Sequence, residues 1–398
     1  MTASPHPRTN WQAVFAVIAA GVIVSMQIGK LPPLLSSLRA EFGLDLVLGG
    51  LLASSVNLIG ATLGIMAGFA SDRIGRRSVS LGLLIAAVGS VIGALAPEGP
   101  AGTIMVLGAR LIEGLGFVLT VVCGPSLVAT SSTDSQRSLA LGFWSSYMPL
   151  GVTGGLLGAL FVNLGLLDWR GLWLAMAVIL VIAAIVIDRL TRGAALPKAR
   201  SFSAAALKRP GPWLLAGCFA TYTTQWFCIV TWMPTYLQDS GLIGSTGIAI
   251  GVALVVLVNA VGTTTSAALM HRGLPRWAII ATVSLGMGIF GVLCFASDLP
   301  VLLRIALAMC ASGFGGMLPA AVLASVPGQA RDPAEIATIN GVVIQLLNIG
   351  SFIGPPTLAA LVTQFGGWSH GRWLLLVAGS IGLLLAFGLR HVERRAAS

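Results

Sequence analysis

Charged residues, histidine and cysteine are scarce in this chain of 398 residues. Only 9% of the residues are charged, and there are four histidines and five cysteines, none of them with CxxC spacing. A soluble globular domain carries about 25% charged residues, so the composition excludes that class. The cysteines indicate neither a disulfide framework nor a zinc site, and we expect all five to be small buried residues.

Hydrophobic residues make up 56% of the chain, and the mean hydropathy is +0.93. Only helices and closed barrels satisfy their own backbone groups in lipid, and barrel strands alternate apolar with polar residues. The long continuous apolar runs of this chain therefore predict helices. The 50 glycines and 19 prolines are compatible with membrane helices, whose neighbours approach closely. We expect an all-α integral membrane protein.

Twelve apolar runs are long enough to cross a bilayer, which takes roughly 20 residues per helix. The first six lie near residues 11–34, 46–70, 78–95, 101–123, 139–163 and 171–188. The other six lie near residues 213–236, 247–270, 277–296, 300–323, 335–363 and 372–390. The longest polar stretch separates the two sets. The pattern predicts a six-helix half over 1–188, a cytoplasmic linker over 189–212 and a second six-helix half over 213–398.

The two predicted halves carry matching residues. The second and eighth runs share an asparagine and a glycine, Asn57 and Gly60 in one and Asn259 and Gly262 in the other. The fifth and eleventh runs share three glycines, which are Gly142, Gly151 and Gly155 in the first half and Gly341, Gly350 and Gly354 in the second. Parallel repeats of this kind are typical of transporters in which one half rocks against the other around a central site.

The 23 lysines and arginines are distributed unevenly among the segments that join the spans. With the N-terminus placed in the cytoplasm, 17 of them lie on the cytoplasmic side. The positive-inside rule therefore predicts a multi-pass protein of the cytoplasmic (inner) membrane with both termini in the cytoplasm. Because the net charge of +10 marks one side of a membrane, we expect no nucleic-acid partner.

The segment GFASDRIGRR follows the second run and contains Gly68, Asp72, Arg73, Gly75, Arg76 and Arg77. It resembles the G-x-x-x-D-R-x-G-R-R signature of the major facilitator superfamily, which lies in the same loop. The twelve spans and the repeat agree with that family along the whole chain. The resemblance implies the major facilitator fold, with two pseudo-symmetric halves, and a gating motif whose ion pairs hold one conformation closed. The arginines could also serve only as topology determinants.

Two further segments resemble motifs within this superfamily. Arg110, Glu113, Gly114 and Gly116 in the fourth run resemble its R-x-x-q-G-x-G motif, which implies that Arg110 faces the central cavity, although glutamate replaces the usual glutamine. PLGVTGG in the fifth run resembles the motif of proton-driven antiporters, but Met148 stands where glycine is expected, which disfavours efflux. The fourth and fifth runs are also similar to the cyanate transporter family, which implies a small anionic or polar solute.

Glu113 is the one acidic residue, among 13, in the interior of a predicted span. A charge at the centre of a membrane helix costs roughly 2.5–3.5 kcal/mol, so it must be paired or functional. At a spacing of three residues, Arg110 and Glu113 share a helix face and can neutralise each other. Alternatively, Glu113 takes up a proton when Arg110 is drawn away, because burial favours the neutral acid and a nearby cation favours the carboxylate. That exchange would couple transport to protons.

Lys30 is the other charge within a span, near the outer end of the first run. It could snorkel to the interface, or it could join Arg110 in a positive cavity suited to a carboxylate or a small inorganic-like anion. We expect polar and aromatic residues of other spans to complete the substrate site, namely Trp144, Tyr147, Gln225, Trp226, Gln345 and Asn348.

The sequence disfavours an enzyme, because the histidines lie at termini or in loops and no phosphate-binding glycine loop occurs. We expect no cofactor and no metal. The main hypothesis is a monomeric, proton-coupled secondary transporter of a small anion that works by alternating access, with the substrate, protons and the lipid bilayer as its partners. The alternatives are a proton-driven drug or metabolite efflux antiporter and a transporter-like ligand sensor.

Overall fold

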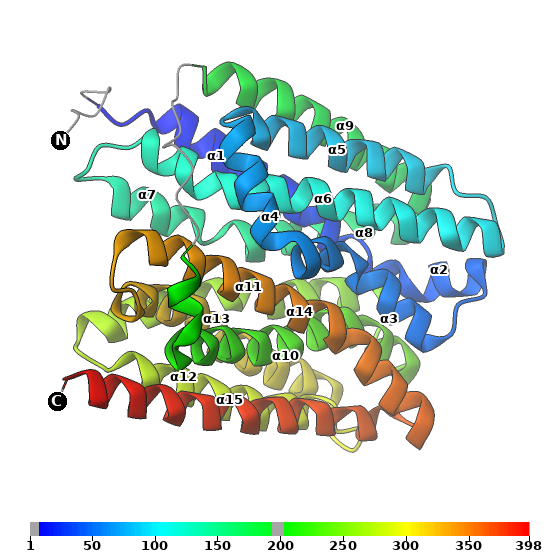
Figure 1. Ribbon diagram of the computed structural model, residues 1–398. Coiled ribbons are helices and arrows are strands. Elements are labelled where there is room, and N and C mark those ends of the chain that lie inside the picture. The colour runs from blue at the N-terminus through cyan, green and yellow to red at the C-terminus, as the bar shows by residue number, and fades with distance from the viewer. Residues whose placement is uncertain (1–7, 193–202, 398) are drawn as a thin grey trace. The chain divides into compact units, whose positions relative to one another are not determined.

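The structure, a computed structural model, describes residues 8–192 and 203–397, and every element of these residues is a helix (Figure 1). Twelve segments of the described chain are long and apolar enough to cross a membrane, one for each predicted run. The protein is therefore all-α with twelve candidate membrane spans.

The first six spans contain nine α-helices, because three of the spans are interrupted. The α-helices are α1 (Trp11–Gly29), α2 (Leu35–Phe42), α3 (Leu46–Ser54), α4 (Leu58–Ile74), α5 (Arg77–Ala94), α6 (Pro100–Thr130), α7 (Arg137–Trp144), α8 (Tyr147–Asn163) and α9 (Trp169–Leu190). Two short 3₁₀ turns, η1 (Pro32–Leu34) and η2 (Ser55–Asn57), lie within the first and second spans.

Each of the last six spans is one continuous α-helix. They are α10 (Pro210–Ser240), α11 (Ser245–His271), α12 (Arg276–Cys294), α13 (Val301–Gln329), α14 (Pro333–Phe365) and α15 (Trp368–Ala397), preceded by the 3₁₀ turn η3 (Ala204–Lys208). Cys310 on α13 is exposed, so the expectation of five buried cysteines is wrong there. The outer face of a membrane helix meets lipid, where a small apolar side chain is as stable as in the core.

The interruptions have local causes. Helix α1 ends at Gly29, because Pro32 and Pro33 provide no N–H donor and restrict the backbone before them. The prediction of one continuous helix over 11–34 is wrong at this point. Near the other two breaks, the hydroxyls of Ser55 and Ser145 bond carbonyls three residues back, a contact that competes with regular helix.

The contacts divide the chain into two compact units. Unit 1 comprises Met1–Leu34, Glu41–Gly43 and Met66–Ala199, and unit 2 comprises Leu35–Ala40, Leu44–Ile65 and Arg200–Ser398. Unit 1 contains α1, α5, α6, α7, α8 and α9, whereas unit 2 contains α3, the first part of α4 and α10 to α15. The predicted boundaries of the two halves stay a prediction.

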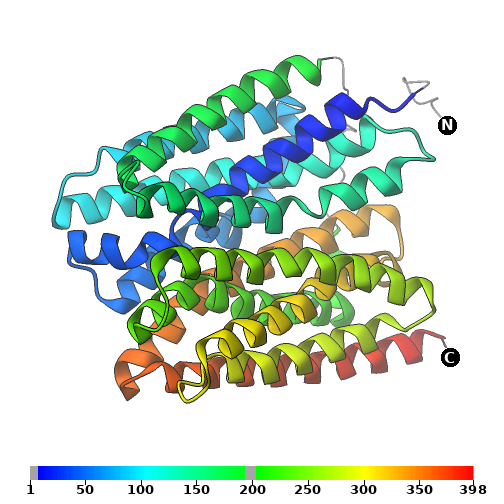
Figure 2. The ribbon, with the colours of Figure 1, turned by 180° about the vertical axis from the view of Figure 1, so that it is seen from behind.

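Repeated glycines bring helices together within each unit. In unit 1, α8 lies against α1 (Figure 2), and a Cβ atom added to Gly151 or Gly155 would overlap the α1 backbone. In unit 2, a Cβ added to Gly350 or Gly354 would meet the α10 backbone in the same way. Two of the three glycine pairs that match between the fifth and eleventh runs therefore permit the same close approach, between the first and fifth spans of each set of six, whereas Gly142 has open space beside it.

Candidate functional site

The charged residues of the predicted spans meet in the interior of unit 1. Lys30, at the end of α1, places its Nζ 2.6 Å from Oε1 of Glu113 on α6, and Arg110 pairs with the other carboxylate oxygen through Nη1. All three side chains are 0% exposed. The pair expected from the i,i+3 spacing is present, and Lys30 does not snorkel to the interface, because the carboxylate of Glu113 holds it inside.

Two neutral side chains complete the hydrogen bonds around these charges. The Oγ of Ser90 on α5 lies 2.7 Å from Oε1 of Glu113, and it also lies 2.9 Å from Oε1 of Gln27 on α1. Nζ of Lys30 donates to this same amide oxygen. A lysine can only donate, so the Gln27 oxygen faces Lys30 and its Nε2 points elsewhere. Arg110 Nη1 also donates to the Gln27 carbonyl, at 2.7 Å.

An aromatic ring covers the lysine. Nζ of Lys30 lies 4.1 Å from the ring centroid of Trp173 on α9, a cation–π contact with a ring that is fully buried. We call the six contacting residues the charge cluster, and they are Gln27, Lys30, Ser90, Arg110, Glu113 and Trp173. Sequence analysis missed three of them. Gln27 lies three residues before Lys30, so helical spacing could have indicated it; Ser90 and Trp173 had no such signal.

Close packing of α5 against α6 positions the carboxylate (Figure 1). A Cβ on Gly89 would lie 2.8 Å from Cγ of Glu113 and 2.8 Å from the Ala109 carbonyl oxygen, so the packing leaves no room for a side chain on α5 at this position. The residue after this glycine, Ser90, then reaches Glu113 directly. Small residues at such an interface are typical of membrane helix pairs.

The charge cluster contains more donors than acceptors. Both Glu113 oxygens and the Gln27 side-chain oxygen accept hydrogen bonds. Four buried nitrogen atoms have no hydrogen-bond partner among the described residues, and these are Arg110 Nε and Nη2, Gln27 Nε2 and Trp173 Nε1. With two cations and one carboxylate, the formal charge is +1 when all three groups are ionised. Spare donors and positive charge together fit a ligand that accepts hydrogen bonds and carries negative charge.

The aromatic pair predicted for the site packs elsewhere in unit 1. Trp144 and Tyr147 stack with ring centroids 4.6 Å apart, and the Trp144 ring lies over Gly21 of α1 and Gly124 of α6. Gly21 precedes Gln27 by six residues, about 9 Å along a helix at 1.5 Å per residue. This aromatic pair therefore packs the helices at another level than the charge cluster.

Four predicted residues belong to unit 2 and make neutral contacts there. Trp226 Nε1 donates to Ser312 Oγ at 3.2 Å, and Gln225 donates to the carbonyl of its own helix. Gln345 donates to the Ala61 carbonyl at 3.0 Å. Asn348 donates to the Ile344 carbonyl and lies against Gly60, so it packs on the start of α4.

The predicted gating motif lies at the end of α4 and in the turn before α5. Gly75 has a positive φ of 73°, which favours glycine in this turn. Arg76 donates to Asp188 Oδ1 on α9 at 2.9 Å, a contact within unit 1, whereas Arg73 and Arg77 are exposed. Gly68 and Asp72 belong to α4, but their side-chain surroundings lie outside the described part of the chain.

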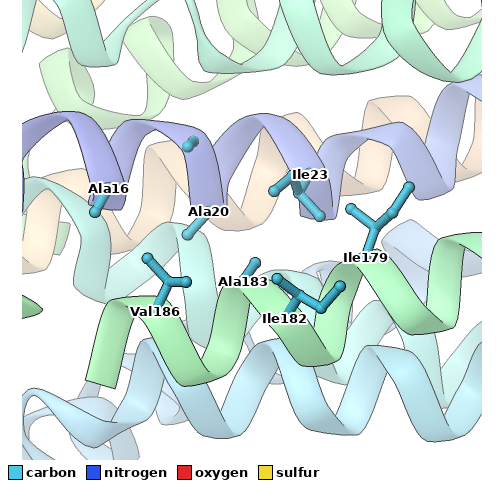
Figure 3. A pocket seen from close by; sticks show the side chains of 8 residues that line it. Ala16, Ala20, Ile23, Ile179, Ile182, Ala183 and Val186 are labelled. Atoms are coloured by element: carbon cyan, nitrogen blue, oxygen red, sulfur yellow. The ribbon is translucent and has the colours of Figure 1, made fainter. Parts of the chain in front are cut away.

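A separate apolar cavity of about 270 Å³ lies between α1 and α9 in unit 1 (Figure 3). Its walls are aliphatic, formed by Ala16, Ala19, Ala20, Ile23, Ile179, Ile182, Ala183 and Val186. These side chains offer no hydrogen bond to a polar solute. The cavity therefore suits hydrocarbon, and the charge cluster is the better candidate for the functional site.

Comparison with known sequences identifies the class of protein to which this helical chain with its buried charges belongs. The sequence model of the Major Facilitator Superfamily matches residues 13–355. The chain therefore belongs to this superfamily of membrane transporters, and it is a transporter, not an enzyme.

Individual relatives are distant. The chain is 22% identical to the cyanate transport protein CynX of Escherichia coli (strain K12) over 361 residues, which cover 89% of this chain and 88% of that protein. It is 32% identical to the arabinose-proton symporter of Bacillus subtilis (strain 168) over 129 residues, or 32% of this chain and 26% of that protein. The first of these relatives agrees with the resemblance to cyanate transporters that the fourth and fifth runs predict.

Solved structures confirm the fold. Two crystal structures of a bacterial homolog of the human lysosomal transporter Spinster are similar, both inward-facing. The occupied form has a TM-score of 0.75 at 16% identity and covers 96% of each chain. The unoccupied form has a TM-score of 0.77 at 15% identity and covers 97% of each chain. At these identities the likeness establishes the major facilitator fold alone.

Proposed function

We propose that this transporter carries a small organic or inorganic-like anion by rocking-type alternating access, and that protons are coupled to transport at the charge cluster. One observation supports the proposal above all others. Four buried donor nitrogens lack acceptors in a cluster whose formal charge is +1 when all three of its ionisable groups are charged. Because each unsatisfied buried donor costs about 1–3 kcal/mol, an anion that accepts from several of them would be bound strongly.

The residues proposed to contact the substrate are chosen by their charge and by their hydrogen-bond donors that lack an acceptor. Arg110 and Lys30 would attract the anion, and Glu113, which holds both, would link binding to proton movement. The neutral residues predicted for the site stay a prediction, with Trp144 and Tyr147 in unit 1 and Gln225 and Trp226 in unit 2. Gln345 and Asn348 in unit 2 are part of the same prediction, and their amides, like that of Gln225, bond to backbone carbonyls.

The membrane arrangement follows from the distribution of basic residues. We propose a monomer in the cytoplasmic (inner) membrane with both termini in the cytoplasm, since 17 of the 23 basic residues then lie inside. In this orientation Arg76 and Asp188 pair at the cytoplasmic ends of their helices. The names of the relatives, a cyanate transport protein and a proton symporter, agree with an anion substrate and with proton coupling.

Efflux of cationic drugs fits the cluster less well. A cationic substrate needs a free carboxylate, whereas Glu113 is already paired with two cations and bonded to Ser90. A ligand sensor would use the same anion site, but it would bind anions without moving them. Flux measurements therefore separate the three functions.

Uptake into proteoliposomes under an imposed pH gradient tests the proposal. The panel comprises small carboxylates, cyanate and thiocyanate, with cationic dyes as the competing class. We expect saturable uptake of at least one small anion, driven by the gradient. Flux of the dyes but not of the anions would refute the proposal, and saturable anion binding without flux would assign the protein to the sensor class.

A second measurement tests proton coupling. Glu113→Gln keeps the size of the side chain but removes its charge, so we expect gradient-driven accumulation to be lost while anion exchange at equal pH continues. The control is Asn259→Gln in unit 2, which changes a buried amide without touching the charge cluster. Undiminished accumulation by Glu113→Gln would leave Glu113 with a structural role.

A further inference from the structure

The charge cluster contains three ionisable side chains, and their charges determine which one can carry a proton. Arg110 stays protonated under the conditions that a protein meets. Only Lys30 and Glu113 can change charge. With Glu113 ionised, the cluster is +1 while Lys30 is protonated and neutral when Lys30 has released its proton. Protonating Glu113 next to a charged Lys30 would instead raise the cluster to +2.

Burial makes the net charge of the cluster energetically important. The three side chains are 0% exposed, and an uncompensated charge in such surroundings is costly. The empty cluster becomes neutral when Lys30 loses its proton. A bound monoanion reverses this preference, because two cations then face two negative groups, Glu113 and the anion. The anion and the proton on Lys30 therefore favour each other.

The groups that face Lys30 allow both of its charge states. The charged groups that face it among the described residues are Glu113 and Arg110, both on α6. The other elements packed against it present neutral groups, which are Gln27 on α1, Gly155 on α8, Ser90 on α5 and Trp173 on α9. Glu113 is therefore the one acidic side chain, among the described residues that face Lys30, that favours its charged form.

The hydrogen bonds adapt to the change of charge. The ammonium form has three N–H donors, matched by Glu113 Oε1 at 2.6 Å, Ser90 Oγ at 3.1 Å and the Gln27 amide oxygen. The neutral amine has two N–H donors and one lone pair. Because a hydroxyl can donate as well as accept, Ser90 can turn its O–H toward that lone pair. Lys30 thus keeps three partners in either state.

We infer that Lys30 is the residue that binds the transported proton, and that a monoanion and this proton enter the cluster together. The inference rests on the proposed function, because it requires an anion at the charge cluster. The proton forms an N–H bond with the lone pair of the amine, and no other bond is made or broken. Since the empty and the loaded cluster are both neutral, transport is a symport of one proton and one monoanion without net charge movement.

Lys30→Arg is the decisive variant, because a guanidinium keeps the positive charge and does not release its proton. Purified full-length protein in detergent is titrated with sodium thiocyanate and with sodium formate. Calorimetry measures anion binding, and a pH indicator in weak buffer measures proton uptake. For the wild type we expect uptake to approach one proton per anion, with affinity falling about tenfold per pH unit on the alkaline side, as reciprocal linkage requires.

The variants should separate the two candidate proton carriers. Lys30→Arg should bind the anion without proton uptake and with an affinity independent of pH. Lys30→Met should bind weakly at every pH, and it tests the same point if arginine does not fit the site. Lys208→Arg, which changes an exposed lysine of unit 2, should behave as the wild type.

Two results would count against the inference, and they differ. Proton uptake that persists in Lys30→Arg would overturn it and assign the proton to Glu113, leaving anion transport intact. Failure of the wild type to bind either anion saturably at any pH would overturn the proposed function, and the inference with it.

Discussion

The interiors of the two units join equivalent helices by different chemistry. In unit 1 the first and fourth spans are linked by charge, through Lys30 and Glu113. In unit 2 the corresponding helices, α10 and α13, are linked by a neutral hydrogen bond from Trp226 to Ser312. The buried charges of unit 2, Arg304 and Glu335, lie in the first turns of their helices.

This difference shows that the repeat preserves packing while the chemistry diverges. Gly155 and Gly354 permit the same close approach of helices in their own units. Neutral hydrogen bonds between membrane helices contribute about 0.6 kcal/mol on average and need no counter-ion. A buried charge always needs a partner, so packing alone does not explain why the interior of unit 1 is charged.

Removing the carboxylate should have the largest effect. Glu113→Ala leaves Lys30 and Arg110 buried without their counter-ion, and we expect a loss of about 3–5 kcal/mol in the free energy of unfolding. Ser312→Ala in unit 2 should cost only about 0.6 kcal/mol, the average for such bonds. Unfolding in mixed micelles by titration with SDS compares the two. Equal losses would show that charge does not distinguish the units.

Replacing the guanidinium of Arg110 should weaken anion binding without unfolding the chain. Arg110→Lys keeps the positive charge but loses the planar fork that carries the spare donors Nε and Nη2. Loss of one charge-assisted hydrogen bond, about 1.5–3 kcal/mol, predicts a roughly tenfold to hundredfold weaker anion affinity. Calorimetry with formate and thiocyanate measures it. Asn259→Gln in unit 2 is the control, and an equal loss there would contradict anion binding by the charges of unit 1.

A matched glycine pair separates packing from function. Gly155→Ala and Gly354→Ala each force a methyl group against a neighbouring helix, and we expect both to lower stability by about 1–3 kcal/mol. Only Gly155 lies at the backbone nitrogen of Lys30, so only Gly155→Ala should also change the pH dependence of anion binding. The same change in Gly354→Ala would mean that strain spreads beyond the altered unit.

The ion pair at the helix ends of unit 1 should matter least. Arg76 and Asp188 are 22% and 35% exposed, so Arg76→Gln should cost at most about 1 kcal/mol, and less at high salt. Its counterpart in unit 2 is the ion pair of Arg209 and Glu335. The Glu335 side chain is only 4% exposed, so Arg209→Gln should cost more stability than Arg76→Gln. Thermal unfolding at two salt concentrations tests this order. A larger, salt-independent loss for Arg76→Gln would favour a gating role.

The spans are predictable from sequence because lipid imposes a simple requirement, a continuous apolar run of sufficient length. The breaks are harder to foresee. The end of α1 follows from Pro32 and Pro33, whereas the breaks at Ser55–Asn57 and Ser145 depend on hydroxyls that elsewhere sit inside regular helix. Ser284 on α12, for example, bonds a carbonyl four residues back without breaking its helix.

The candidate site is predictable only where its contacts are local. Arg110 and Glu113 are three residues apart, so helical spacing predicts their pair. Lys30 and Glu113 are 83 residues apart, and their contact depends on how α1 packs against α6. Ser90 and Trp173 are likewise ordinary residues in their own segments. They become part of the site only through the packing of α5 and α9.

The cation–π contact at Lys30 also gives the protein an optical reporter. The colour of indole fluorescence depends on the electric field across the ring, and the amine of Lys30 lies 4.1 Å from the centre of the Trp173 ring. A charge that comes and goes at this distance changes that field strongly in a buried site. With the other nine tryptophans replaced, the emission of Trp173 would follow each change in the charge of Lys30, without any added dye.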